Sequence, residues 1–315
     1  MNTITMRFGR QLRVAAALCG VLTGCGDRKP PTPPTVPPQQ FATPEEAASA
    51  LVSASEKYDV PALKMILGSD GDDLVSSEDT IADRNHAIAF AAEARVHERL
   101  EFDSAKTTVV LNVGAEDWPM PIPIVEQAGR WHFDAASGRE EVLRRRIGEN
   151  ELNAIQLCRD YVDAQRTYSF TRRDGSIVNQ YAQRVVSTPG KQDGLAWRAA
   201  DGTWQGPMAE TIAQYISEGY SERYDPFHGY YFKILKGQGP AAPLGEMNFM
   251  VEGAMLGGFA LVAAPADYGV TGIKTFIVSW EGTVYEKDLG QATLEAFKTM
   301  ERYNPDSTWQ VVQNP

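Results

Sequence analysis

The spacing of apolar residues after residue 42 predicts that the first third of the chain begins with helices. Thr43 is followed by proline and two glutamates, so it has the pattern of an N-cap with Glu46 at the capping-box position. Apolar residues then recur every three or four positions as far as Tyr58. This period is typical of an amphipathic helix with one face turned toward a core.

Two more helices and an acidic stretch are expected before residue 101. Asp59 is the predicted N-cap of a helix over 60–67, and the pattern favours a third helix over 80–100. Between them, the run DDLVS over 72–76 favours a short strand. It belongs to an acidic stretch over 69–79, which we interpret as a solvated loop because its spacing does not fit a calcium-binding loop.

The pattern then changes to strands, returns to one long helix and ends in strands. Gly129 separates two of the strand-like runs and predicts a hairpin, as does the Glu281-Gly282 pair later in the chain. The long helix is expected over 135–168, where apolar positions follow a helical period. The strand-like segments are 106–114, 120–127, 129–134, 229–237, 246–269 and 274–289.

This order of elements indicates an α+β fold in two parts. Residues 43–135, with helices before three strands, resemble the NTF2-like cone, in which a curved sheet wraps around helices and can enclose a pocket. Residues 136–315 contain the run SWEGTVYEKD, which resembles the terminal hairpin of pilin and pseudopilin heads. The resemblance implies a long helix packed on an antiparallel, pilin-head-like sheet.

The first 24 residues are typical of a secretory signal. Three arginines precede a short apolar run over 14–22, which is too short to cross a membrane as a helix. Leu22-Thr23-Gly24-Cys25 resembles the lipobox of bacterial lipoproteins. That resemblance implies that Cys25 carries a diacylglycerol and holds the protein in the membrane; the alternative is a plain signal peptide with a coincidental cysteine.

The composition of the chain bears on its tether, its net charge and its cysteines. The segment 25–42 is rich in proline, which predicts an extended tether between the anchor and the folded part. Removal of residues 1–24 would take away three arginines and no acidic residue, so the net charge of −11 becomes −14. A chain this acidic is repelled by phosphate backbones, which excludes nucleic acid as an expected partner. Of the three cysteines, Cys158 is expected to be a buried apolar residue.

Residues 41–312 as a whole resemble a bacterial family catalogued as domain of unknown function 2950. The segments that carry the resemblance are NELNAIQLCRDYVDAQRTY, STPGKQDGLAW, DPFHGYYFKILKGQGPAAP and GGFALVAAPADYGVTGIKTFIVSWEGTVYEKDLG. The resemblance implies a location in the cell envelope, facing the periplasm, and it implies no activity. Gly26 after the cysteine favours the outer membrane, by analogy with enterobacterial sorting.

The sequence contains no familiar catalytic or metal-binding motif. The four histidines form no HExxH or paired metal spacing, and GxSxG, P-loop and GxGxxG motifs are absent. We therefore expect no metal and no cofactor. RRDGSIVNQY, over 172–181, has one Asp-Gly and is interpreted as a turn.

Two groups of residues remain as candidate sites. Trp118, Trp131 and His132 could line a pocket in the cone, although they could equally fill it. Asp225, Phe227, His228 and Tyr230 could form a recognition patch, or His228 could be a general base oriented by Asp225. The alternative for this second group is an aromatic cluster that closes the junction between the two parts, with Gly229 in a tight turn.

These observations favour a non-catalytic binding or scaffolding protein of the envelope that engages a protein partner there. The alternative is a small-ligand carrier or an enzyme that uses the cone cavity. Fold resemblance by itself cannot choose between them.

Overall fold

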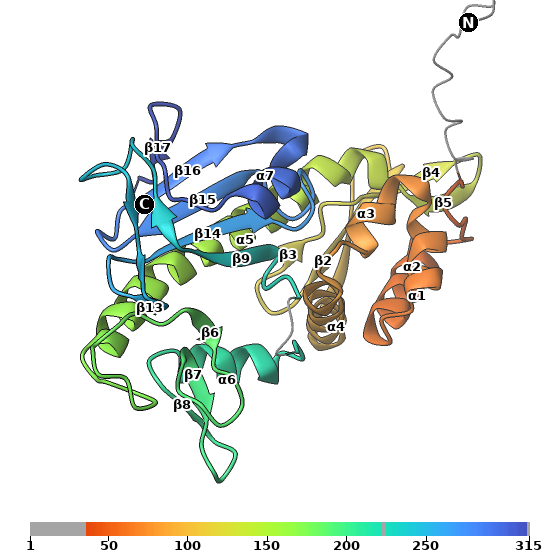
Figure 1. The fold of residues 1–315 in the computed structure, drawn as a ribbon. Coiled ribbons are helices and arrows are strands. Elements are labelled where there is room, and N and C mark those ends of the chain that lie inside the picture. Colours follow the sequence, from red (N-terminus) through yellow and green to blue (C-terminus); the bar gives the residue numbers. More distant parts are fainter. Residues whose placement is uncertain (1–35, 222–224, 314–315) are drawn as a thin grey trace, which may run out of the picture. The chain divides into compact units, whose positions relative to one another are not determined.

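A computed structural model describes residues 36–221 and 225–313 (Figure 1). The predicted signal peptide, Cys25 and the first part of the predicted tether lie outside the described residues. Up to Phe133 the chain forms helices followed by antiparallel strands. These elements are α1 (Pro44–Glu56), α2 (Val60–Leu67), the 3-10 helix η1 (Ser69–Gly71), α3 (Asp72–Val75), α4 (Thr80–Val96), β1 (Glu98–Phe102), β2 (Thr108–Val113), β3 (Trp118–Pro119), β4 (Ile124–Gln127) and β5 (Arg130–Phe133).

The predicted starts of the first two helices are confirmed. The Thr43 hydroxyl accepts a hydrogen bond from the Glu46 amide at 3.2 Å, and the Asp59 carboxylate accepts one from the Ala62 amide at 3.1 Å. Each cap satisfies an amide that has no partner within its helix. Gly68, with φ of 71°, ends α2 in a backbone conformation that favours glycine.

Two predictions in this region are wrong. Residues 72–75 form the helix α3 rather than a strand, because they continue directly from η1. The third helix ends at Val96, and Glu98–Phe102 forms β1, paired antiparallel with β2. The pairing partner lies later in the chain, so tertiary contact rather than local preference decides the conformation of this segment.

One face of the first sheet is buried under helices. The strand order is β1-β2-β4-β5, with β3 paired to β2, and α1 and α2 contact β5 while α4 contacts β2. The buried side chains of Leu111, Ile124 and Phe133 lie in this core. Phe41 joins the same core and pairs with Trp131. The end of the predicted tether, from residue 36, is therefore part of the folded body.

The long predicted helix is confirmed as α5 (Ala135–Ser169), which spans about 50 Å at 1.5 Å per residue. Its first turns contact α3, where the Arg146 guanidinium donates to the Leu74 carbonyl at 2.7 Å. Its second half packs on β14 and β15, and the Tyr161 hydroxyl donates to the Ala260 carbonyl at 3.3 Å. This one helix therefore connects the two hydrophobic cores of the chain (Figure 1).

The second core surrounds a five-stranded antiparallel sheet in the order β17-β16-β15-β14-β9. Gly282, with φ of 87°, makes the predicted turn between β15 and β16. The main sheet contains β9 (Tyr230–Leu235), β14 (Ala260–Pro265), β15 (Lys274–Ser279), β16 (Val284–Asp288) and β17 (Gln310–Val311). Shorter elements are β10 (Gly237–Gln238), β11 (Met247–Asn248), β12 (Met250–Val251), β13 (Ala254–Met255), η2 (Gly290–Ala292) and α7 (Thr293–Thr299).

A small three-stranded sheet and a helix follow α5 in the chain, before the first strand of the main sheet, β9. They are β6 (Arg184–Val186), β7 (Gly194–Arg198), β8 (Trp204–Gln205) and α6 (Ala209–Ser217). β6 runs parallel to β7, and β8 runs antiparallel to it. The expected α+β class is confirmed, whereas this insertion was not predicted. Among the residues that the structure describes, no helix is both long and apolar enough to span a bilayer.

Cys158 is fully buried in the second core, as expected, and is a free thiol. Burial raises its pKa to about 12, so the reactive thiolate is scarce at neutral pH. We predict that the folded chain with Cys19 and Cys25 replaced by serine does not react with a chromogenic disulfide reagent at mildly alkaline pH. One thiol per chain should react once denaturant unfolds it. Rapid stoichiometric reaction of the folded chain would contradict this burial.

Candidate binding surface at residues 168–204

The three residues predicted to line a cone pocket are not brought together. Trp118 lies opposite Val113 at one end of β2. Thr108, at the other end of β2, pairs with Val125 of β4, and Val125 in turn pairs with His132, the neighbour of Trp131 on β5. At about 3.4 Å per residue, these levels are roughly 17 Å apart along β2. His132 points to the opposite face of β5 from Trp131, since neighbouring side chains on a strand alternate.

Each of the three also has its own surroundings. The Trp118 ring is exposed and lies under the Arg145 guanidinium at 5.1 Å. Trp131 meets Phe102 edge to face at 6.2 Å, and His132 Nδ1 is buried with no hydrogen-bond partner among the described residues. The structure therefore shows no common pocket for them.

The second predicted group is only partly at the surface. Tyr230 is completely buried in β9 and donates from its hydroxyl to the Lys274 carbonyl at 2.9 Å, so it cannot belong to a surface patch. His228 Nε2 lies 2.8 Å from Glu218 Oε2, whereas Asp225 accepts a hydrogen bond from Ser221 at 2.5 Å. The predicted orientation of His228 by Asp225 is therefore wrong, because Glu218 stands beside the imidazole.

Aromatic rings surround this imidazole. Phe227 stacks on His228 with ring centroids 4.2 Å apart, and it also contacts Tyr215 and Tyr220. His228 and Gly229 both have positive φ, 46° and 75°, as the tight turn requires. The arrangement is that of a packed cluster between elements rather than of an open catalytic site.

A buried carboxylate connects this cluster to the first part of the chain. Asp79 is 2% exposed and accepts hydrogen bonds from the Tyr220 hydroxyl at 3.0 Å and from the Gly229 amide at 2.7 Å. It is also the N-cap of α4. The interpretation of 69–79 as a solvated loop is thus wrong at its end, where a structural carboxylate joins α4 to the 220–229 segment.

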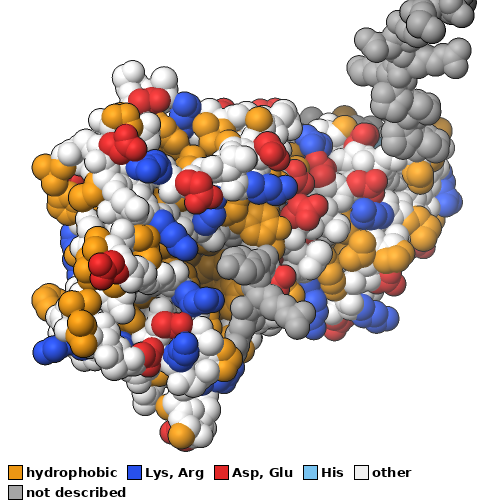
Figure 2. All heavy atoms as spheres, in the orientation of Figure 1, with side chains coloured by type: hydrophobic (Ala, Val, Ile, Leu, Met, Phe, Trp, Pro, Cys, Tyr) orange, Lys and Arg blue, Asp and Glu red, His pale blue; other side chains and the backbone are white. Residues whose placement is uncertain are grey.

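Two of the three most exposed large apolar side chains in the described residues of the second part follow the end of α5. Phe170 is 81% exposed and Ile177 is 87% exposed, and the neighbouring Val178 is also exposed. Figure 2 shows hydrophobic side chains on the surface where this loop lies in Figure 1. Isolated exposed apolar residues are common, but a group of them on one loop is typical of a contact surface.

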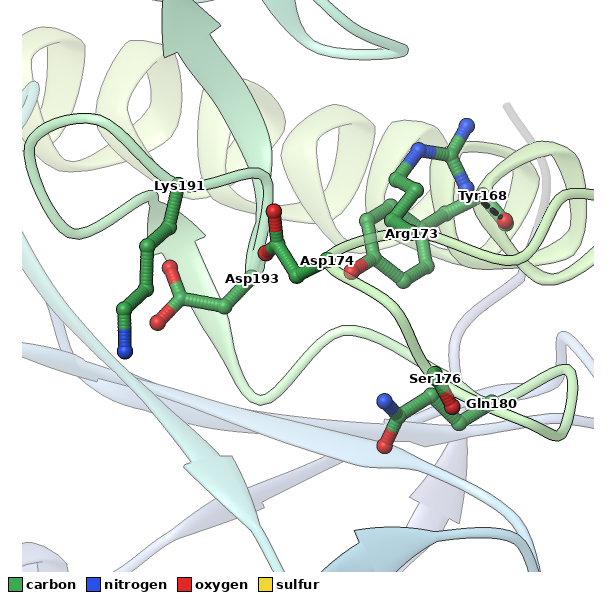
Figure 3. Close-up of a pocket in the computed structure, with 7 residues that line it drawn as sticks. All are labelled: Tyr168, Arg173, Asp174, Ser176, Gln180, Lys191 and Asp193. Atoms are coloured by element: carbon green, nitrogen blue, oxygen red, sulfur yellow. Dashed lines mark hydrogen bonds between the residues drawn. The ribbon is translucent and has the colours of Figure 1, made fainter.

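The same loop forms one wall of a polar cavity of about 420 Å³ (Figure 3). The end of α5 and the loop before β7 supply the rest. Figure 3 shows Asp174, Asp193 and Lys191 close together on one side and Ser176 and Gln180 on the other. The lining residues are Tyr168, Arg173, Asp174, Ser176, Gln180, Lys191 and Asp193.

Two of the charged residues in the lining hold the loops in place. Arg173 donates to the carbonyls of Tyr168 and Thr171 and lies over the Tyr168 ring at 4.2 Å. Asp193 accepts from the amide and the hydroxyl of Thr188 at 2.7 and 2.8 Å. Although burial raises the pKa of Asp193, the Thr188 hydrogen bonds and Arg184 lower it more, so the carboxylate stays ionised at neutral pH.

A second, more apolar cavity of about 460 Å³ is also lined by residues of the loop before β7. The Arg198 guanidinium stacks over the Trp204 ring in its wall at 4.4 Å. Both cavities therefore share one loop, whose residues 187–197 are the segment STPGKQDGLAW.

No motif in the sequence predicts this surface. The run FTRRDGSIVNQY over 170–181 has a turn composition, yet it contains Phe170, Ile177 and Val178 with no helical or strand period. Apolar residues in a turn that do not follow the period of a core-facing helix or strand are the sequence feature that could have indicated an exposed contact surface. Across 36–221 and 225–313, no group of three or more His, Cys, Asp or Glu side chains is placed to hold a metal ion.

The family described as "Protein of unknown function (DUF2950)" matches residues 38–312, and the chain belongs to it, as the sequence resemblance predicted. The match includes both hydrophobic cores and the surface at 168–204. The comparisons with curated proteins and with solved structures found no match.

Proposed function

We propose that this DUF2950 protein is a non-catalytic binding protein of the bacterial cell envelope. The lipidated Cys25 holds it in the membrane, with the outer membrane favoured, and its folded part faces the periplasm and engages a protein partner there. The anchor and the location rest on the lipobox-like segment and the preceding signal pattern.

The observation that carries the binding role is the exposure of Phe170 and Ile177 beside the polar cavity. Burial of a large apolar side chain in an interface contributes about 1.5–3 kcal/mol. Apolar anchors surrounded by a polar rim are the usual composition of a protein contact.

We predict that Phe170→Ser combined with Ile177→Ser abolishes capture of this partner. The measurement is chemical crosslinking in cells that naturally make the protein, followed by identification of what co-purifies with wild type and variant. Both side chains are almost fully exposed, so the double variant should unfold at the wild-type temperature.

Leu244→Ser provides the matched control, since Leu244 is 84% exposed and lies outside this surface. A partner that is lost from the double variant and kept by Leu244→Ser supports the proposal. A partner kept by both variants would place the contact elsewhere. A protein that crosslinks to nothing in wild-type cells would contradict a binding role.

A further inference from the structure

The polar cavity contains opposite charges that do not neutralise each other. Lys191 is exposed at its edge, and within the described part of the chain its ammonium forms no ion pair with any carboxylate. One oxygen of Asp174 accepts a hydrogen bond from the Gln192 amide at 2.8 Å. The other oxygen accepts none from a described residue. An anionic and a cationic group thus remain available in one small cavity.

Most of the other lining side chains already have hydrogen-bond partners, which limits the groups that a ligand could contact. Arg173 already donates to the carbonyls of Tyr168 and Thr171, and Asp193 already accepts from Thr188. Ser176 donates to the Val178 carbonyl at 2.8 Å. The side-chain amide of Gln180, in contrast, makes no hydrogen bond to the described residues, so it can both donate and accept.

We propose that this cavity binds a zwitterion of the size of a short peptide. The ligand's ammonium would meet the free oxygen of Asp174, its carboxylate would meet the Lys191 ammonium, and its peptide group would meet the Gln180 amide. The inference deepens the proposed function, on which it rests, by naming the chemical class that the binding surface recognises.

The balance of charge in the cavity favours a zwitterion over a simple ion. A lone anion near Lys191 would also be repelled by Asp174 and Asp193, and a lone cation near Asp174 would be repelled by Lys191 and Arg173. A molecule that carries both charges meets an opposite charge at each end. The volume of about 420 Å³ lies within the range of about 300–1,000 Å³ that small-molecule sites occupy.

The test is calorimetric titration of the folded protein with the dipeptide alanylalanine, followed by its N-acetylated and its C-amidated forms. We expect saturable binding of the free dipeptide and at least about tenfold weaker binding of each blocked form, since each lacks one charge. Equal affinity for free and blocked dipeptides would overturn the proposal. So would the absence of any binding by the free dipeptide.

Two substitutions test the assignment to this cavity. Asp174→Asn keeps an oxygen for the Gln192 amide, and Lys191→Met keeps the apolar stem, so both variants should fold. Each is expected to weaken alanylalanine binding at least about tenfold. The controls Asp163→Asn and Lys57→Met remove exposed charges elsewhere and should leave the affinity unchanged. Equal effects of variants and controls would overturn the assignment.

The experiments distinguish failure of the proposed partner contact from failure of the zwitterion site. Partner capture that depends on Phe170 and Ile177, without dipeptide binding, overturns only the zwitterion site. Dipeptide binding that depends on Asp174 and Lys191, with capture indifferent to Phe170 and Ile177, supports the zwitterion site and removes the proposed partner contact.

Discussion

Arg146→Met should lower the free energy of unfolding by about 3–5 kcal/mol at neutral pH, because it leaves a buried carboxylate without its counter-charge. The Arg146 side chain is 12% exposed, and its guanidinium lies 3.7 Å from Asp83, whose side chain is 3% exposed. Arg146 also donates to the carbonyls of Asp73 and Leu74, at 2.9 and 2.7 Å. The substitution therefore removes the contacts that the Arg146 side chain makes from α5 to both α3 and α4.

The loss should depend on pH in a defined direction. Burial raises the pKa of Asp83, although hydrogen bonds from Ser77 and the charge of Arg146 lower it in part. Because the folded-state pKa is raised, the stability that Asp83 contributes is fully present below its unfolded pKa of about 3.9 and is lost as pH rises through the folded value. Removal of Arg146 moves the folded pKa further upward. The loss of unfolding free energy in Arg146→Met should then be complete at neutral pH. It should become smaller as the pH falls and Asp83 takes up a proton.

Urea unfolding at about pH 7 and about pH 5 measures this difference. Arg144→Met is the matched control on the same helix, since Arg144 is 73% exposed and pairs with Glu141 at the surface. It should cost less than about 1 kcal/mol at both pH values. A deficit of Arg146→Met that is the same at both pH values would mean that hydrogen bonds and packing, rather than the buried charge, account for it.

Asp79 illustrates why only part of the fold could be predicted from sequence. The caps at Thr43 and Asp59 and the whole of α5 depend on residues close in the chain, so local patterns predicted them correctly. The strand β1 depends on pairing with β2, and the burial of Asp79 depends on Tyr220, which is 141 residues away. No local pattern contains such distant partners.

The candidate site shows the same limit. STPGKQDGLAW carries part of the family resemblance, and the composition of 172–181 predicts a turn, but no local pattern indicates that these two segments line one cavity. The predicted pocket residues Trp118 and Trp131 failed for the opposite reason. Their chemistry suggested a pocket, while strand register places them at distant levels of β2.

Gly138→Ala should destabilise the protein by about 1–3 kcal/mol or more, although alanine favours a helix by nearly 1 kcal/mol over glycine. Gly138 is buried in α5, and an added Cβ would lie 2.6 Å from both the Ile122 Cα and the Pro121 carbonyl oxygen. These are backbone atoms of the segment that leads into β4, so they cannot move aside as a flexible side chain would. The segment or the helix would have to shift.

Gly148→Ala in the same helix is the matched comparison and should have the opposite sign. Apart from the neighbouring backbone of the helix itself, no atom of the described residues lies within 4 Å of the Cβ that it would add. Only the helix preference and the smaller entropy of the unfolded chain then act, and they stabilise by about 0.5–1 kcal/mol. Thermal or urea unfolding of the two variants measures both effects. Stabilisation by both substitutions would mean that α5 does not approach the 121–122 backbone closely, and the packing of the first part of the chain against this helix would have to be revised.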